Sequence, residues 1–206
     1  TPENVKKYIS NGFKVYLEKN YGQHLDIIDE KFSENGAEFF SDKKKIIKES
    51  NILLQLNLPN EEDLKNLSPK NNLIGVFDPV NNKDLISKIS RNNINVFSLE
   101  LLPRITRAQS MDILSSQANL AGYKAVVDAF SYFNKAIPMM MTAAGTIPAA
   151  KVLVVGAGVA GLQAIATAKR MGAIVFATDV RMASKEQVES LGGKFLVVEG
   201  SENLET

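Results

Sequence analysis

Short apolar runs alternate with amphipathic stretches along the first hundred positions. The runs are short enough for buried strands, and the stretches between them have helical spacing, as in Leu85, Ile86 and Ile89. Because parallel strands need a crossover connection, this alternation predicts a doubly wound α/β domain over residues 1–108. The expected strands are 13–17, 38–40, 52–56, 73–77 and 94–99, and the expected helices are 28–35, 43–49, 60–67 and 82–91, with a further helix start at Thr1-Pro2-Glu3.

The pattern changes after residue 105. Residues 109–134 contain only three charges, Asp112, Lys124 and Asp128, among many apolar positions. This predicts a long, largely buried helix that a capping box over residues 106–109 starts and Pro138 ends. We expect this helix, over residues 109–137, to bridge two domains.

A βαβαβ pattern occupies the remainder, residues 138–206. Its expected strands are 151–155, 173–177 and 194–198, and its expected helices are 159–171 and 184–191. This is half of a dinucleotide-binding fold. The sequence therefore predicts an α/β protein with two doubly wound Rossmann-like domains with parallel sheets, joined by a long helix, the second domain incomplete. We expect the sequence to be a piece of a longer chain, because it begins without Met and stops at residues 201–206, just after an apolar run.

Composition narrows the possible chemistry. With 24 Lys and Arg against 23 Asp and Glu, the net charge of +1 provides no positive field for a nucleic acid. The absence of Cys and the single His24 exclude thiolate metal sites and sites with two imidazoles, so metal chemistry would have to rest on carboxylates. No metal site is predicted. The longest uncharged run, residues 136–150, is broken by Pro and Gly and is too short for a membrane span.

The strongest motif is the glycine turn Gly156-Ala157-Gly158-Val159-Ala160-Gly161, directly after an expected strand. Gly156 suits a tight turn, Gly158 lets the backbone approach a pyrophosphate, and Gly161 lets the helix pack closely on the sheet. The helix N-terminus then favours an anion.

The next expected strand ends in Asp179, close to the spacing of the acid that binds a ribose. Such a carboxylate accepts both ribose hydroxyls and repels a 2′-phosphate, so NAD(H) is preferred over NADP(H). The alternative is a structural glycine turn with Asp179 as a helix cap. Val180 and Arg181 follow at once, and Arg181 has two open roles, contact with a phosphate or pairing with Asp179.

A second set of polar residues lies at the start of the long helix. Asp112, Ser115, Ser116 and Asn119 share one helix face, and Arg104 and Arg107 lie on the loop before it. Loops at the carboxyl ends of strands line the ligand crevice of an open α/β sheet, so these side chains suit a nicotinamide. Their spacing is equally compatible with helix capping alone.

Other conspicuous residues are assigned no chemistry. His24 is expected to be exposed or capping, residues 43–45 to be a solvated helix start, and the methionines at 139–141 to be packing material between the domains.

The motifs together resemble one family. The segments 103–117, 119–123, 138–146 and 156–193 are similar to the NAD(H)-binding component of proton-translocating nicotinamide nucleotide transhydrogenase. The resemblance is specific over residues 99–198 and diffuse before them.

This resemblance implies a Re/Si-specific, proton-translocating NAD(P)+ transhydrogenase, subunit alpha, in which NADH transfers hydride directly to NADP+. It implies a homodimer that works with an NADP(H)-binding component and a membrane-spanning component. Its implied location is peripheral, on the cytoplasmic side of the inner membrane or facing an organelle matrix. The nicotinamide-positioning residues it implies are Arg104, Gln109, Asp112 and Ser115; the cofactor-binding residues are Gly156, Gly158, Val159, Ala160, Gly161, Asp179, Val180 and Arg181.

Two alternatives share the same fold. An alanine dehydrogenase-type enzyme resembles this chain, but such enzymes use a Lys and a His in the first domain. Here Gln55 and Asn57 stand where the Lys is sought, and residues 73–79 contain no His. A catalytically silent NAD-binding module is the other alternative.

Overall fold

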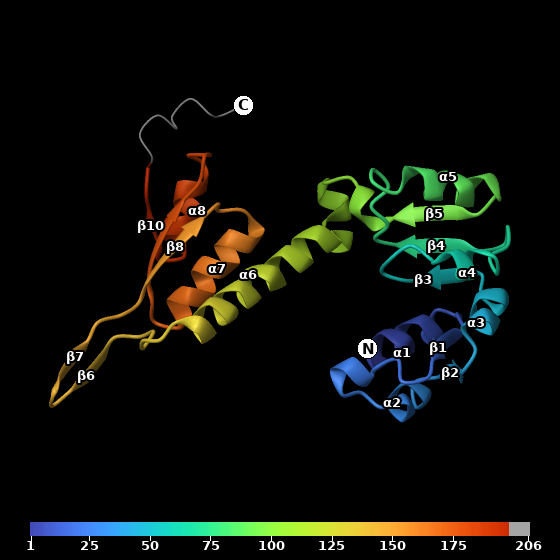
Figure 1. Ribbon diagram of the computed structural model, residues 1–206, viewed down its shortest axis with the longest axis horizontal. Helices are drawn as coiled ribbons and strands as arrows, with labels where there is room; N and C mark the ends of the chain where they lie inside the picture. The colour runs from blue at the N-terminus through green and yellow to red at the C-terminus, as the bar shows by residue number, and fades with distance from the viewer. Residues whose placement is uncertain (198–206) are drawn as a thin grey trace. The chain divides into compact units, whose positions relative to one another are not determined.

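The computed structural model describes residues 1–197 and consists of two compact units, Thr1–Met111 and Asp112–Thr206. Each unit is an α/β arrangement whose main sheets are parallel, as the sequence predicts (Figure 1). The expected strand through Val198 extends beyond the described residues, and residues 201–206 lie outside them.

Unit 1 alternates strands and helices in the expected order, with element ends shifted by a few residues. Its first helix begins at Pro2, where Thr1 Oγ1 accepts a hydrogen bond from Asn4 N. The elements are α1 (Pro2–Ser10), β1 (Val15–Glu18), α2 (Asp29–Ser33), β2 (Ala37–Phe40), α3 (Lys43–Glu49), β3 (Ile52–Leu54), α4 (Glu61–Leu64), β4 (Asn72–Gly75), α5 (Lys83–Arg91) and β5 (Asn95–Ser98), followed by 3-10 helices Leu99–Leu101 and Thr106–Met111.

The parallel strands of unit 1 form two hydrogen-bonded sheets, β1-β2 and β3-β4-β5, where the sequence predicts one. Each sheet has its own apolar cluster: Phe32 is buried in the first, and Leu73 and Phe77 are buried in the second. Burial of apolar area stabilises each sheet through its own cluster. The strands of β1-β2 therefore do not need to pair with those of β3-β4-β5 in one continuous sheet. Helix α3 contacts β1 and β2 and buries Ile47 in the second cluster.

Unit 2 contains the predicted βαβαβ pattern. The strand order β10-β9-β8 is that of the first half of a dinucleotide-binding sheet, and Val152 is in register with Val175. Its elements are α6 (Ile113–Tyr132), β6 (Met140–Thr142), β7 (Gly145–Ile147), β8 (Lys151–Val155), α7 (Val159–Arg170), β9 (Ile174–Thr178), α8 (Ser184–Ser190) and β10 (Lys194–Phe195).

The core of unit 2 lies between one face of this sheet and the helices α6, α7 and α8 (Figure 1). Ile165, Val175 and Val188 are fully buried there. Leu153 and Val155, which point to the other face of β8, are 59% and 79% exposed. Successive side chains of β8 point to opposite faces of the sheet, so one face is packed against helices and the other is exposed to solvent.

Helix α6 differs from its prediction in three respects. It ends at Tyr132 instead of at Pro138, because Phe133 already has an extended backbone conformation. It begins after Asp112, because the Asp112 carboxylate caps it by accepting from Ser115 N, whereas residues 106–111 form a 3-10 helix. It is also not largely buried: among its residues only Gly122 and Val126 are buried, and Leu120 is 60% exposed. A helix that carries apolar residues on several sides buries only the side that meets a neighbour.

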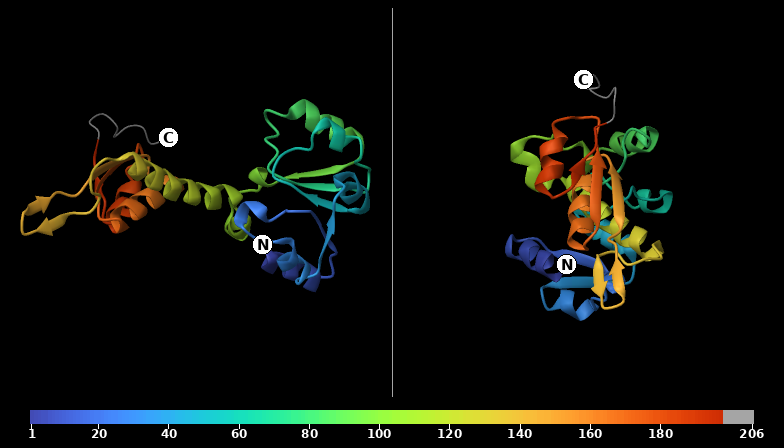
Figure 2. Two further views of the ribbon diagram at one scale, coloured as in Figure 1. Left: turned by 60° about the horizontal axis from the view of Figure 1, so that its bottom comes forward. Right: turned by 90° about the vertical axis from the view of Figure 1, so that its left-hand side faces the viewer.

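The segment between α6 and β8 forms an antiparallel hairpin of β6 and β7, which projects from the rest of unit 2 (Figure 2). Met139, Met140 and Met141 are all exposed, the last by 77%. Within the described part of unit 2 they are not covered, because a two-stranded hairpin has no second layer of its own. Their expected role as packing material between the domains remains a prediction.

Small residues set the distance between α6 and α7. At Gly122 an added Cβ would overlap the carbonyl oxygen of Ala160, and at Gly172 it would come within 2.7 Å of Pro138 Cβ. Gly122 in α6 meets Ala160 at the start of α7, and Pro138, which follows α6, meets Gly172, which follows α7. Both segments therefore pass the two contacts in the same order, so α6 and α7 run in the same direction.

We expect Gly122→Ala to lower the free energy of unfolding by about 1–3 kcal/mol, because the helices must separate to accept the methyl group. Asn119→Ala, at an exposed position one turn earlier in the same helix, is the control and should change stability little. Urea unfolding followed by circular dichroism measures both variants. Equal or higher stability of Gly122→Ala would show that the helices do not need this close approach, since alanine is otherwise the better helix former.

Candidate functional site: a glycine turn at the ends of β8 and β9

The glycine turn follows β8 directly. Gly156 has a φ of 95°, a conformation that strains any residue with a Cβ, and its N–H donates to the Thr178 carbonyl at 2.8 Å. That bond joins the end of β8 to the end of β9. The two loops that leave the sheet therefore start side by side.

The two later glycines of the motif face opposite surroundings. Gly158 caps α7, and a Cβ added at Gly158 or at Gly156 would meet no atom within 4 Å. At Gly161, by contrast, a Cβ would overlap the carbonyl oxygen of Gly156. The turn is thus open on the side where a ligand could approach its backbone and closed on the side where the helix packs.

Open backbone beside a helix N-terminus suits an anionic group. The first amides of an α-helix have no acceptor within the helix, and the helix dipole adds partial positive charge. Val159, the first residue of α7, is 44% exposed. The backbone of Ala160, the second residue of α7, contacts Gly122 of α6. The geometry therefore fits the pyrophosphate of a dinucleotide.

Asp179 is fixed beside this turn. Its side chain is only 6% exposed, and Oδ2 accepts a hydrogen bond of 2.6 Å from Ala157 N, inside the glycine turn. Its Oδ1 accepts from Arg181 N at 2.9 Å and from Arg181 Nε at 3.0 Å. The role of Ala157 is not predictable from the sequence, since a backbone N–H donor does not depend on residue type.

Hydrogen bonds from the Arg181 side chain, supported by the backbone amides of Ala157 and Arg181, hold the pKa of the Asp179 carboxyl far below its ordinary value. Burial acts in the opposite direction and is outweighed. The carboxylate is therefore ionised near neutral pH. Of the two roles left open for Arg181, pairing with Asp179 is the one seen here, while Val180 between them is 56% exposed.

A second polar pair stands at the start of α6. The Asp112 carboxylate accepts from Ser115 N at 3.0 Å and from Ser115 Oγ at 2.6 Å. Ser115 lies seven residues before Gly122, which is about 10 Å along the helix from the crossing with α7. Because α6 and α7 run in the same direction, both helix starts point toward the same end of unit 2.

The remaining residues of the predicted nicotinamide set belong to unit 1. Arg104 is exposed in the loop after Leu99–Leu101, and Gln109 is exposed in the 3-10 helix Thr106–Met111. Within their own units, the structure brings Asp112 together with Ser115, and Asp179 together with Arg181 and the glycine turn. The association of Arg104 and Gln109 with these groups remains a prediction.

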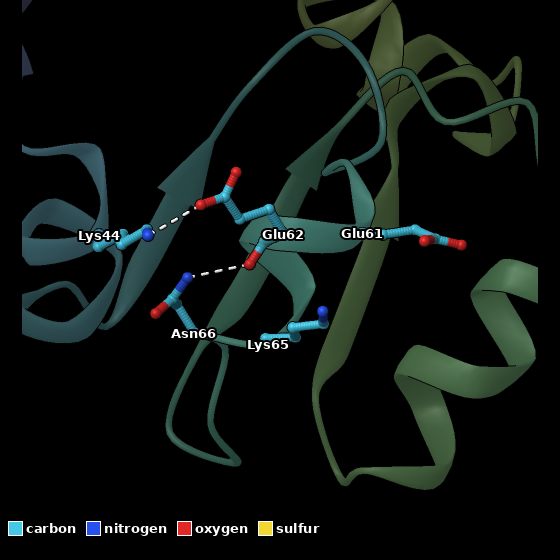
Figure 3. Close-up of a pocket in the computed structure, with 5 residues that line it drawn as sticks. All are labelled: Lys44, Glu61, Glu62, Lys65 and Asn66. Carbon is cyan, nitrogen blue, oxygen red and sulfur yellow. Dashed lines mark hydrogen bonds and ion pairs between the residues drawn. The ribbon is translucent and has the colours of Figure 1, made fainter.

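A cavity of about 530 Å³ lies in unit 1 between α3 and α4 (Figure 3). Lys44 Nζ and Glu62 Oε1 are 2.8 Å apart there, which raises the pKa of Lys44 and lowers that of Glu62. Both side chains are exposed, so the pair is a surface contact. The lining residues are Lys44, Glu61, Glu62, Lys65 and Asn66.

A second ion pair, which no sequence pattern predicts, lies beside this cavity. Lys43 Nζ lies 2.6 Å from Asp63 Oδ2, whose side chain is 8% exposed, so the lysine is not merely solvated. His24, in contrast, is exposed as expected. Within residues 1–197 no cluster of three metal-ligating side chains was found, and no helix in that range is long and apolar enough to cross a membrane.

The fold and the turn define a Rossmann-like α/β protein with a dinucleotide-type glycine turn. The chain matches the family descriptions "Alanine dehydrogenase/PNT, N-terminal domain" over residues 1–121 and "Alanine dehydrogenase/PNT, C-terminal domain" over residues 125–205. It therefore belongs to the alanine dehydrogenase/PNT family, and the resemblance noted from the sequence is confirmed.

Sequence identity is higher to transhydrogenases than to an alanine dehydrogenase. An NAD(P) transhydrogenase subunit alpha polypeptide from Rhodospirillum rubrum is 46% identical over 204 residues, 97% of this chain and 53% of that protein. The crystal structure of transhydrogenase from Sinorhizobium meliloti is 49% identical with a TM-score of 0.90, covering 96% of this chain and 59% of that chain. Alanine dehydrogenase from Methanococcus maripaludis is 24% identical over 196 residues, 94% of this chain and 52% of that protein. The chain spans about half the length of these relatives.

We expect Asp179→Asn to lower the free energy of unfolding by about 2 kcal/mol at neutral pH, because the amide cannot accept from all its present donors. A carboxyl with a depressed folded-state pKa stabilises the fold above its unfolded pKa of about 3.9 and loses this effect as pH falls toward the folded-state value. The difference between wild type and variant should therefore narrow below about pH 4 in urea unfolding.

Asp128→Asn is the matched control, since Asp128 pairs with Lys124 on the exposed surface of α6 and should contribute less than about 0.5 kcal/mol. A difference between wild type and Asp179→Asn that stays constant down to about pH 3 would contradict the assignment of this stabilisation to the ionised carboxylate.

Proposed function

We propose that this chain is the NAD(H)-binding portion of a proton-translocating NAD(P) transhydrogenase. The observation that carries the proposal is the glycine turn of unit 2, open at Gly156 and Gly158 and tied through Ala157 to the carboxylate of Asp179. The 46% identity to an NAD(P) transhydrogenase subunit alpha polypeptide supports the same conclusion.

In this proposal the cofactor-binding residues contact two parts of the dinucleotide, the pyrophosphate and the adenosine ribose. Gly156, Gly158, Val159, Ala160 and Gly161 offer backbone to the pyrophosphate at the start of α7, as glycine turns of this kind do. Asp179, with Val180 and Arg181 beside it, accepts hydrogen bonds from the hydroxyls of the adenosine ribose. The acid excludes a 2′-phosphate, so NAD(H) is the ligand.

The nicotinamide end belongs to Arg104, Gln109, Asp112 and Ser115. The cap at Asp112 and Ser115 supports this, because the start of α6 points the same way as the start of α7 and lies about 10 Å further along. A nicotinamide and its ribose are of that order in length. Arg104 and Gln109 are polar and exposed, so both side chains are accessible to a ligand.

Bound NADH would supply a hydride that passes directly from its nicotinamide to the nicotinamide of NADP+, giving NAD+ and NADPH. No proton enters or leaves the protein in that step, so no acid or base side chain is required. The task of this chain's residues is to hold the ring in one orientation and exclude water. Positioning of this kind supplies about 7–11 kcal/mol in favourable cases.

The partners follow from the same proposal. NADP(H) is held on a separate component, and a membrane-spanning component couples the reaction to proton translocation, with this chain peripheral on the cytoplasmic or matrix side. We also infer a homodimer. Unit 2 has exposed apolar side chains, including Leu120 and Tyr123 on α6 and Met141 on the hairpin. Their exposure supports contact between this unit and another protein chain.

Mixing the full chain with NADH and a transhydrogenase NADP(H)-binding component loaded with NADP+ tests the proposal. We expect hydride exchange, seen as NADPH formation, and no reduction of NAD+ by alanine. Alanine-dependent reduction of NAD+ would overturn the proposal in favour of an amino-acid dehydrogenase. Binding of NADH without any turnover would overturn it in favour of a silent module.

For the nicotinamide end, we expect Gln109→Asn to slow hydride transfer by about tenfold to a hundredfold while NADH affinity changes far less, because a shorter side chain displaces the ring without removing the binding contacts of unit 2. Stopped-flow transfer rates and NADH titration measure the two effects. Gln23→Asn, at another exposed glutamine of unit 1, is the matched control. An unchanged transfer rate in Gln109→Asn would remove that residue from the site.

A further inference from the structure

The Arg181 side chain donates hydrogen bonds to the carboxylate of Asp179, the group that the proposed function assigns to the ribose hydroxyls. It lies in the loop between β9 and α8, and its Nε and Nη2 are 3.0 Å and 3.3 Å from the two oxygens of Asp179. Together with the amides of Ala157 and Arg181, these contacts give the carboxylate four hydrogen bonds. An ionised carboxylate has about four acceptor positions, so all are in use.

Only one of these donors is free to leave. The amides of Ala157 and Arg181 are fixed by the backbone, and the Asp179 side chain is 6% exposed, whereas the Arg181 side chain is 58% exposed. The guanidinium can therefore turn into solvent while the carboxylate stays. Two ribose hydroxyls would then find the two acceptor positions that it releases.

The same guanidinium has the geometry for a phosphate. Arginine binds carboxylate and phosphate with the same pair of parallel N–H groups, and its present contact with Asp179 already uses two nitrogens in this way. What prevents a 2′-phosphate from taking that place is the charge of Asp179, which both neutralises the arginine and repels the phosphate.

We propose that Arg181 is a latent 2′-phosphate ligand held off by Asp179, so that the acid and the arginine together determine the preference for NAD(H) over NADP(H). This rests on the proposed function, because it assumes that the adenosine ribose lies at Asp179. Removal of the carboxylate alone should convert the site toward NADP(H) with no new cation introduced.

The experiment measures dissociation constants of NADH, NADPH, 5′-AMP and 2′,5′-ADP for the full chain by calorimetry. The variants are Asp179→Ser, which keeps a hydroxyl acceptor for Ala157 N, and the double variants that add Arg181→Gln or Arg181→Lys. In Asp179→Ser we expect NADPH and 2′,5′-ADP to bind about tenfold to a hundredfold more tightly than in wild type.

The double variants identify the arginine as the source of this gain. Adding Arg181→Gln should abolish the gain for 2′,5′-ADP but not alter 5′-AMP binding to the same degree, and Arg181→Lys should retain some of it, because it keeps the charge without the planar pair of donors. Thermal unfolding of each variant confirms that the chain is folded.

The outcomes separate this inference from the function on which it rests. Wild type that does not bind NADH would overturn the proposed function. Wild type that binds NADH, with a folded Asp179→Ser that gains no affinity for 2′-phosphorylated ligands, would overturn the role of Arg181 alone. A gain that survives Arg181→Gln unchanged would also overturn it.

Discussion

The hydrogen bond from Ala157 N to the carboxylate of Asp179 joins the two loops on which the proposed site depends. One loop is the glycine turn after β8, and the other is the loop that follows β9. Parallel pairing of β8 with β9 brings the two loops to one edge of the sheet, and the buried carboxylate fixes their separation. A single charged group thus orders the backbone that would meet the pyrophosphate and the side chain that would meet the ribose.

The packing of α6 on α7 extends this arrangement along unit 2. Gly122 removes the side chain that would hold the helices apart, and Gly161 does the same between α7 and the glycine turn. Close packing is rigid, so the cap at Asp112 and Ser115 is held at a fixed distance from the turn. That rigidity would serve the proposed hydride transfer, in which orientation of the rings takes the place of acid and base catalysis.

The sequence predicts the order of elements and the glycine motif well, because both are local patterns. The strand before Gly156, the helix after it and the acid after the next strand are all found where the spacing places them. The predicted start of α6 was wrong, since a capping box over residues 106–109 and a cap at Asp112 are both acceptable locally, and only the observed Ser115 contacts show which forms.

Features that arise from packing were not predictable in the same way. The exposure of α6 and of the methionines at 139–141 depends on which neighbours are present, and the separation of unit 1 into two sheets depends on how the apolar clusters divide. The ion pair of Lys43 with Asp63 joins residues twenty positions apart, so no local pattern reveals it. Arg181 was visible in the sequence, but its distance from Asp179 was not.

In the proposed site, Asp179 binds the adenosine ribose of NADH at the end of β9. Calorimetric titration of the full chain with NADH, compared between wild type and Asp179→Ala, measures this contact, with Asp128→Ala as a control for loss of a carboxylate elsewhere. We expect Asp179→Ala to weaken binding by about tenfold or more while the control binds as wild type does. Equal affinities of wild type and Asp179→Ala would contradict it.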